Sequence, residues 1–168
     1  LQALPLSRQA LEKTLGIAAR RPPVAFAARS LFDRFPAAIG KASRRVLYFA
    51  GCYAGYIRPE IGEAAVRLLN HLGYAVHLPD QHCCGLPLLS KGLAAAARQK
   101  VADNLTRWRH LIDTIDAIVV TCSSCGYALQ GEWGYLAQGP LVEAVGRQTV
   151  HISQLFKPDN MRLKNEAP

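Results

Sequence analysis

From residue 46 onward, short continuous apolar runs alternate with segments of helical spacing, and this alternation restricts the fold class most. The run at 46–50 reads Val-Leu-Tyr-Phe-Ala, which is typical of a strand buried on both faces. Further strands are predicted at 74–78, at 117–120 and, as a short fourth strand, at 149–152. Strands that alternate with crossover helices predict an α/β fold, with a parallel sheet of about four strands and helices on both faces.

The segments between these strands carry helix signals. Pro59 suits the first turn of a helix whose apolar residues keep helical spacing up to Gly73. A long helix is predicted within about 88–112, and residues 124–136 are also helical in pattern. We expect Arg107, Trp108 and Arg109 to form a solvated face of the long helix.

Positive charge is concentrated before the first strand. Residues 1–45 hold nine Lys or Arg and two acidic residues, a balance of +7, whereas the rest of the chain holds eleven and ten, a balance of +1. Two amphipathic pieces, separated by Arg20-Arg21-Pro22-Pro23, lie within this segment. We therefore predict a basic helical arm or linker over 1–45, an α/β domain over 46–157 and a C-terminal tail over 158–168.

The charge asymmetry indicates a partner for the arm. An anionic membrane surface and a partner subunit are the favoured candidates. Nucleic acid is not expected as a partner, because no nucleic-acid-binding motif is present. Leu1 is not an initiator methionine, and no secretory leader or run of ~18 apolar residues occurs. We expect a cytoplasmic piece of a longer protein, with peripheral contact at the inner face of the cell membrane as one role of the arm.

The five cysteines all follow predicted strands. They lie in the three loops at the carboxyl ends of the first three strands and at the start of the helix after the third: Cys52, Cys83, Cys84, Cys122 and Cys125. Open α/β sheets bind ligands at that edge. We therefore expect the three loops to converge on one crevice.

The number and spacing of the thiols favour a metal or a cluster over disulfides. A small disulfide scaffold would have an even cysteine count and a shorter chain. Cys122-Ser-Ser-Cys125 alone is compatible with a redox pair or with half of a zinc site. The neighbours Cys83 and Cys84, whose side chains are expected to diverge, suit different metal atoms of one cluster. Five thiols also exceed the four that tetrahedral zinc or a cubane needs, so either one thiol is spare or the cofactor has more ligand positions than a cubane.

Other residues near the cysteines receive plainer interpretations. His82 is expected to be a solvated loop histidine, and Ser123 and Ser124 are expected to cap the following helix. Trp133 and Tyr135 are expected to cover the crevice or to pack.

Three motifs carry a resemblance to a known family: Phe49-Ala50-Gly51-Cys52, Asp80-Gln81-His82-Cys83-Cys84-Gly85 and Val120-Thr121-Cys122-Ser123-Ser124-Cys125-Gly126. They resemble the cysteine-rich CCG domain family, whose members include subunits of heterodisulfide reductase, of anaerobic glycerol-3-phosphate dehydrogenase and of the iron–sulfur systems for glycolate and lactate oxidation. The resemblance implies that all five cysteines are cofactor ligands. It implies a 4Fe–4S cluster, noncubane as in heterodisulfide reductase, with zinc as the alternative known in some relatives.

The same resemblance implies a function. The chain would be the iron–sulfur electron-transfer subunit of a membrane-associated flavin dehydrogenase that oxidises a small hydroxy acid or glycerol 3-phosphate. A flavoprotein subunit would supply the electrons, and quinone or another acceptor would receive them. A heterodisulfide-type reductase and a zinc-bound structural or interaction module are the two alternatives. The family usually has two such motifs, and this chain has one, as expected of a fragment.

Overall fold

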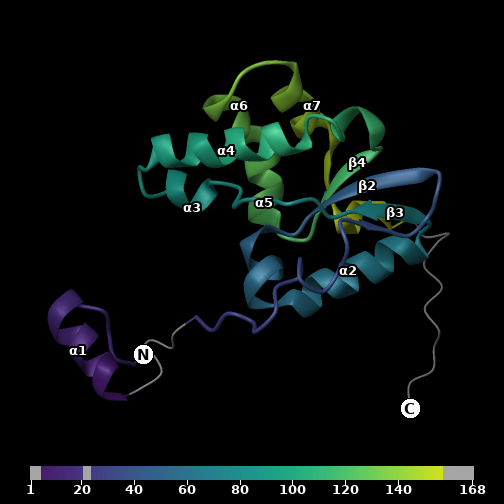
Figure 1. Ribbon diagram of the computed structural model, residues 1–168. Helices are drawn as coiled ribbons and strands as arrows, with labels where there is room; N and C mark the ends of the chain where they lie inside the picture. The colour runs from purple at the N-terminus through teal and green to yellow at the C-terminus, as the bar shows by residue number, and fades with distance from the viewer. Residues whose placement is uncertain (1–4, 21–23, 157–168) are drawn as a thin grey trace, which may run out of the picture.

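The computed structural model describes residues 5–20 and 24–156, and its centre is a five-stranded sheet in the order β1-β3-β2-β4-β5 (Figure 1). The four parallel strands are, in chain order, β2 (Arg44–Phe49), β3 (Tyr74–His77), β4 (Ala117–Val120) and β5 (Thr149–His151). The predicted α/β class is confirmed. The fifth strand, β1 (Ala38–Ile39), was not predicted and pairs antiparallel with β3 at the edge.

Strand β2 lies in the middle of the sheet, which explains its unbroken apolar sequence. Val46 is paired with Val76 of β3 on one side and with Ala117 of β4 on the other. The residues of β2 that follow Val46 alternate between the two faces of the sheet, and helices cover both faces. Consequently Val46, Leu47, Tyr48 and Phe49 are all fully buried.

Helices cover both faces of this sheet (Figure 1). Helix α2 (Pro59–His71) covers one face and packs Val66 and Leu69 against Val46 and Tyr48. Helices α4 (Ala94–Trp108) and α7 (Pro140–Gln148) cover the other face with the cluster that contains Leu47 and Phe49. Helix α7 was not predicted from the sequence.

The predicted helix within 88–112 is divided in the structure. A short helix, α3 (Leu86–Leu89), ends in a turn at Gly92, whose φ of +76° favours glycine, and α4 begins at Ala94. The expectation that Trp108 is solvated is wrong, because its side chain is fully buried in the core. A 3₁₀ turn, η2 (Ile112–Thr114), leads from there toward β4.

The predicted helical stretch 124–136 is formed by three consecutive elements. They are α5 (Ser123–Tyr127), the π-helix η3 (Ala128–Glu132) and α6 (Trp133–Leu136). A second π-helix, η1 (Tyr53–Ile57), directly follows Cys52, and a 3₁₀ turn, η4 (Ile152–Leu155), follows β5. Both π-helices thus directly follow segments that carry cysteines, which fits the frequent occurrence of π-bulges at functional sites.

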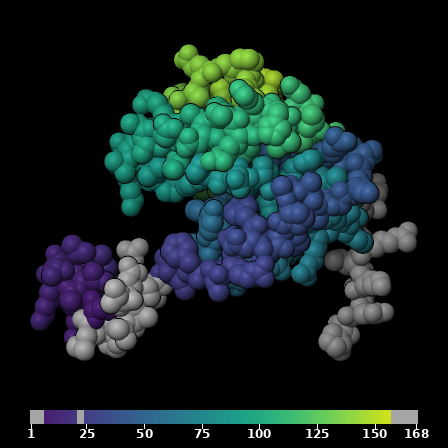
Figure 2. Space-filling model, viewed as in Figure 1, coloured from purple at the N-terminus to yellow at the C-terminus, as the bar shows by residue number. Residues whose placement is uncertain are grey.

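The predicted basic segment contains helix α1 (Pro5–Leu15) and, over 24–37, turns rather than a second helix. These turns lie against the domain (Figure 2). The amide of Leu31 donates to the carbonyl of Gly55 at 2.8 Å, and the Leu31 side chain is fully buried. The predicted limits at residues 46 and 157 remain predictions, and the predicted tail lies outside the described residues. Among the described residues, no helix is both long and apolar enough to cross a bilayer.

Candidate metal centre

The structure places the five cysteines at the carboxyl-terminal edge of the sheet. Cys52 follows β2, Cys83 and Cys84 lie between β3 and α3, and Cys122 and Cys125 lie at the start of the α5 segment after β4. None of the five forms a disulfide. The strand order β3-β2-β4 brings these three loops next to one another.

Four of the thiols form a continuous series of contacts, which we call the thiol row: Cys52, Cys83, Cys84 and Cys125. Hydrogen bonds join the thiols of Cys52 and Cys83, of Cys83 and Cys84, and of Cys84 and Cys125. The expectation that the Cys83 and Cys84 side chains diverge is therefore wrong in part, because these thiols touch each other as well as different outer neighbours. The role of the cysteines as ligands remains a prediction.

Cys122 lies beside the thiol row and near Tyr48. The Tyr48 hydroxyl pairs with Thr121 Oγ1 at 2.9 Å. Burial raises the pKa of Tyr48 to about 12, and negative charge on Cys125 and Cys122 acts in the same direction. The Tyr48–Thr121 pair thus links the end of β2 to the loop that carries Cys122.

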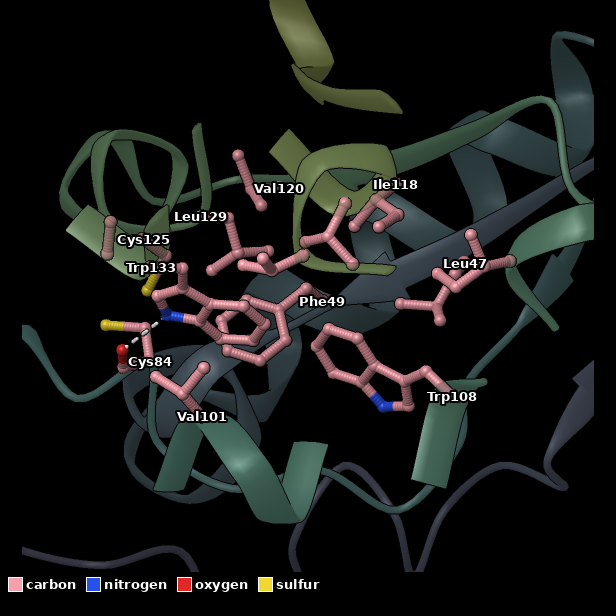
Figure 3. Close-up of a cluster of buried hydrophobic side chains, with 14 of the residues drawn as sticks. Leu47, Phe49, Cys84, Val101, Trp108, Ile118, Val120, Cys125, Leu129 and Trp133 are labelled. Atoms are coloured by element: carbon pink, nitrogen blue, oxygen red, sulfur yellow. Dashed lines mark hydrogen bonds between the residues drawn. The ribbon is translucent and has the colours of Figure 1, made fainter. Parts of the chain in front are cut away.

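Burial changes steeply along the thiol row. Cys84 and Cys125 are only 5% and 6% exposed and belong to the core cluster that includes Trp133 and Leu129 (Figure 3). Cys83 is partly buried, and Cys52 is exposed. The row therefore has a buried end, Cys84 and Cys125, and an open end, Cys52.

Without a bound cation Cys52, Cys83 and Cys84 favour the protonated thiol form. A hydrogen bond with Cys84, followed by burial, raises the pKa of the Cys83 thiol. A hydrogen bond with Cys125 contributes most to raising the pKa of the Cys84 thiol to about 12. Burial raises the pKa of Cys52. Several adjacent thiolates therefore require a compensating positive charge, which a metal centre supplies.

Backbone amides already point at these sulfur atoms. The N–H groups of Gly85, Leu86 and Tyr53 donate to the thiols of Cys83, Cys84 and Cys52 respectively, and each lowers the pKa of its partner. Such N–H···S hydrogen bonds stabilise thiolate ligands and adjust the potential of a cluster.

Gly51 allows two of the cysteine loops to approach closely. Its φ is +65°, and a Cβ at this position would lie 2.9 Å from the sulfur of Cys125. Any larger residue would thus press against the buried end of the row. Across residues 5–20 and 24–156, no three His, Cys, Asp or Glu side chains are arranged to hold a single metal ion. The soft donors, the amides directed at sulfur and the glycine contact fit a cluster held by several thiolates.

Three buried side chains fasten the loops to one another through their polar groups: Gln81, Asn104 and Trp133. The sequence had indicated packing or a cover for Trp133, and this fastening role was predicted for none of the three. Gln81 accepts from the Gly51 amide at 3.3 Å and donates to the Tyr48 carbonyl at 3.1 Å. For Asn104, the sequence offered one indication of such a role: it is a polar residue at a core-facing position of α4.

The other candidates near the site differ from expectation in detail. His82 is partly exposed and lies 3.7 Å from Asp103 and 3.4 Å from Arg107. Neither Ser123 nor Ser124 caps α5, because Cys122 occupies the N-cap position without a side-chain cap bond. Trp133 packs in the core, whereas Tyr135 is 84% exposed.

A cavity of about 540 Å³ adjoins the cysteine loops. Gln81 and His82, which directly precede Cys83, line one side of it, and Tyr56 of η1 and Phe32 line another. Arg107 contributes a positive charge to its wall. The cavity is therefore open to a small polar molecule.

Comparison with known proteins identifies one family. The family model CCG, described as a cysteine-rich domain, matches residues 46–130, which include all five cysteines. This interval begins within β2 and ends within η3, so it covers the three loops that form the thiol row. No solved structure is significantly similar to the chain.

Several curated relatives are subunits of oxidoreductases. One subunit of the anaerobic glycerol-3-phosphate dehydrogenase of Escherichia coli (strain K12) is 30% identical over 131 residues, which cover 75% of this chain and 33% of that protein. One subunit of the fumarate reductase (CoM/CoB) of Methanothermobacter marburgensis is 33% identical over 127 residues, with coverages of 74% and 25%. One subunit of the dihydromethanophenazine:CoB–CoM heterodisulfide reductase of Methanosarcina acetivorans is 29% identical over 124 residues, with coverages of 70% and 29%. The chain thus spans about a third or less of the length of these relatives.

Proposed function

The chain belongs to the CCG cysteine-rich domain family, and from this premise we propose that it is the iron–sulfur electron-transfer component of a multi-subunit oxidoreductase. The proposed ligands are the five cysteines of the three loops: Cys52, Cys83, Cys84, Cys122 and Cys125. The observation that carries the proposal is the thiol row, in which sulfur atoms from three distant segments interact at one edge of the sheet.

Each part of the site has a task in this function. A bound cluster would supply one-electron chemistry with little change of geometry. The buried end would keep water from Cys84 and Cys125, while the amides of Gly85 and Leu86 would stabilise negative charge on the sulfur atoms. The exposed Cys52 would lie closest to a redox partner.

A 4Fe–4S cluster of noncubane type is the proposed cofactor, because five thiols exceed the four that a cubane or a tetrahedral zinc ion needs. Zinc is the alternative, and the chain would then be a structural or interaction module. The pairwise contacts of the thiol row favour a centre larger than one ion.

The proposed partners follow from the relatives. A flavoprotein dehydrogenase subunit would oxidise a small hydroxy acid or glycerol 3-phosphate, and the electrons would pass through this chain toward quinone or another acceptor. The basic N-terminal segment also exposes apolar side chains, among them Leu15, Val24 and Phe26. This combination supports the proposal of a cytoplasmic protein with peripheral contact at an anionic membrane surface.

Anaerobic purification tests the proposal. We expect a coloured protein with iron and acid-labile sulfide, a visible charge-transfer band and a spin-resonance signal in at least one redox state. Cys83→Ser and Cys52→Ser should each change these spectra, whereas Ser123→Ala, beside the site, should leave them unchanged. A colourless preparation that contains only zinc would overturn the electron-transfer function, and spectra unaffected by both cysteine substitutions would remove the ligand assignment.

The cavity lined by Gln81 and His82, which precede Cys83 in the chain, favours a second candidate, a heterodisulfide-type reductase. Two electrons and two protons would convert a disulfide in that cavity into two thiols. Reduced methyl viologen as electron donor and a small mixed disulfide as substrate test this candidate. Disulfide-dependent oxidation of the dye by the wild type, weakened at least fivefold in Tyr56→Ala, would favour the reductase; no oxidation would leave the electron-transfer function as the better proposal.

A further inference from the structure

Two fully buried polar side chains hold consecutive backbone groups of the segment that carries Cys83 and Cys84. They are Asn104 of α4 and Trp133 of α6, both 0% exposed. Burying an amide or an indole N–H costs free energy unless it is hydrogen-bonded. All the hydrogen bonds described for these two side chains go to residues 82–84.

Asn104 holds the backbone on the N-terminal side of the cysteine pair. Its Oδ1 accepts from the amide of His82 at 2.7 Å. Its Nδ2 faces the carbonyl oxygens of His82 and Cys83, each at 3.4 Å. Ala97, Val101 and Trp108 occupy the other buried positions of the same helix face, so the polar side chain is an exception within an apolar row.

Trp133 holds the backbone on the C-terminal side of the pair. Its indole Nε1–H donates to the carbonyl oxygen of Cys84 at 2.8 Å, in the interior of the core cluster (Figure 3). Trp133 belongs to the helical segment that follows the Cys122–Cys125 loop. The bond therefore ties the third cysteine segment to the second.

Together these contacts determine how two adjacent thiols are directed. With the carbonyls of Cys83 and Cys84 held from two different helices, the peptide between the two residues has little freedom to rotate. In this conformation the Cys83 thiol meets Cys52 and the Cys84 thiol meets Cys125. A cofactor that binds both Cys83 and Cys84 needs one of these thiols directed toward the open end of the row and the other toward the buried end.

We propose that Asn104 and Trp133 are positioning residues, which hold the Cys83–Cys84 backbone so that both thiols reach the same cluster. The proposal rests on the iron–sulfur function proposed above. It assigns no direct contact between either side chain and the cluster. Both act through the backbone of the ligating residues.

Trp108 provides a matched control. It is also fully buried in the same core cluster and stacks on Trp133 with ring centroids 5.7 Å apart. Its Nε1 faces the carbonyl of Asp80 at 3.4 Å, which lies three residues before Cys83. Replacing either tryptophan by phenylalanine removes one indole N–H and a similar volume from the same cluster, but only Trp133→Phe removes a bond to a cysteine.

The experiment compares wild type, Trp133→Phe and Trp108→Phe as full chains loaded anaerobically. It measures iron per chain, the spin-resonance spectrum, the reduction potential and the rate of iron loss to a chelator. We expect Trp133→Phe to shift the spectrum and the potential and to speed iron loss at least fivefold. Trp108→Phe should keep the wild-type spectrum and lose iron within twofold of the wild-type rate, even where its melting temperature falls equally.

Asn104→Asp provides a second variant if Trp133→Phe fails to fold. It keeps an oxygen to accept from His82 but loses the donors to the His82 and Cys83 carbonyls, and it should shift the same spectrum. A wild-type spectrum in the folded Trp133→Phe or Asn104→Asp protein, or equal shifts in both tryptophan variants, would overturn the positioning role. A wild type that binds no iron would instead show that the proposed function itself is wrong.

Discussion

The two ends of the thiol row differ in what surrounds the sulfur atoms. Cys84 and Cys125 lie inside the hydrophobic cluster with Trp133 and Leu129. Cys52 is exposed, and Tyr53 next to it is 51% exposed. One residue type therefore has two physical roles: at the buried end cysteine is part of the core, and at the open end it is part of the surface.

This difference suggests a division of tasks in the proposed centre. A ligand inside the core is fixed by packing and shielded from water, so its loss should disturb both the cofactor and the fold. An exposed ligand is accessible to a partner, and water can occupy its place. The following predictions test this contrast, from the largest expected effect to the smallest.

The largest effect is expected when a ligand is removed from the buried end. Cys84→Ser should abolish iron and sulfide binding, because the hydroxyl enters an apolar site and the sulfur ligand is lost. Cys52→Ser should keep at least half of the iron with an altered spectrum, because its side chain is exposed on one side while those of Cys84 and Cys125 are buried. Iron and sulfide assays after anaerobic loading measure both. Equal iron contents in the two variants would show that burial does not separate the ends.

Gly51 tests the contact between the two ends. Gly51→Ala should lower iron content severalfold, because the new Cβ would lie 2.9 Å from the sulfur of Cys125. Its positive φ of +65° should add a strain of about 1 kcal/mol.

Gly92→Ala is the control for this strain. Gly92 has a φ of +76°, and a Cβ there would meet no atom within 4 Å. Chemical denaturation should show the loss due to backbone strain alone in Gly92→Ala and a larger loss in Gly51→Ala, with normal iron content in Gly92→Ala alone. Normal iron content in Gly51→Ala would contradict a close approach of the two loops.

Asn104, which holds the backbone before and at Cys83, should contribute measurably to stability. Asn104→Ala leaves the amide of His82 and nearby carbonyls without their partner, and the free energy of unfolding should fall by about 2–3 kcal/mol. Asn70→Ala removes one bond, to the Val66 carbonyl within α2, and should cost about 1 kcal/mol or less. Urea denaturation of the metal-free proteins compares them, and equal losses would argue against a special role for Asn104.

Tyr48 should give the smallest effect, and that effect depends on pH. Its pKa is raised from the ordinary value of 10 to about 12, chiefly by burial. Between these pH values the unfolded chain releases the phenol proton while the folded chain keeps it, so the stability from Tyr48 is complete below pH 10 and falls as pH rises toward 12.

Tyr48→Phe should therefore remove part of the alkaline loss of stability. At pH 7 it should cost only about 1 kcal/mol, because Thr121 loses its partner. Denaturation between pH 8 and about 11 measures the difference from wild type. Identical pH profiles for the two proteins would show that this phenol is not protected from ionisation.

Local sequence patterns predicted the parallel strands well and the helix limits less well. The run Val46–Ala50 predicted a central strand, because residues on both faces of such a strand must be apolar. The division between α3 and α4 at Gly92 was missed because the apolar residues on both sides of the turn keep a helical appearance. Trp108 was assigned to a solvated face because its two arginine neighbours outweighed it in the local pattern.

The location of the five cysteines was predictable from the sequence, but their contacts were not. Strand ends follow from local patterns, so the sequence placed all five cysteines at one edge of the sheet. Asn104 and Trp133 were not identified as anchors, because each bonds to a loop about 20 or more residues away along the chain. No local pattern contains such a pair.

The amino-acid sequence by itself determined the parallel α/β class and the location of the cysteines after their strands, since both depend on the spacing of apolar residues over a few turns or strands. Tertiary structure alone decided which thiols meet and which side chains hold the cysteine loops. It also decided that Cys84 and Cys125 are buried while Cys52 is exposed. The strand order β3-β2-β4 and the packing of α4 and α6 set those contacts. Such contacts arise from the simultaneous burial of distant segments, which no single segment specifies.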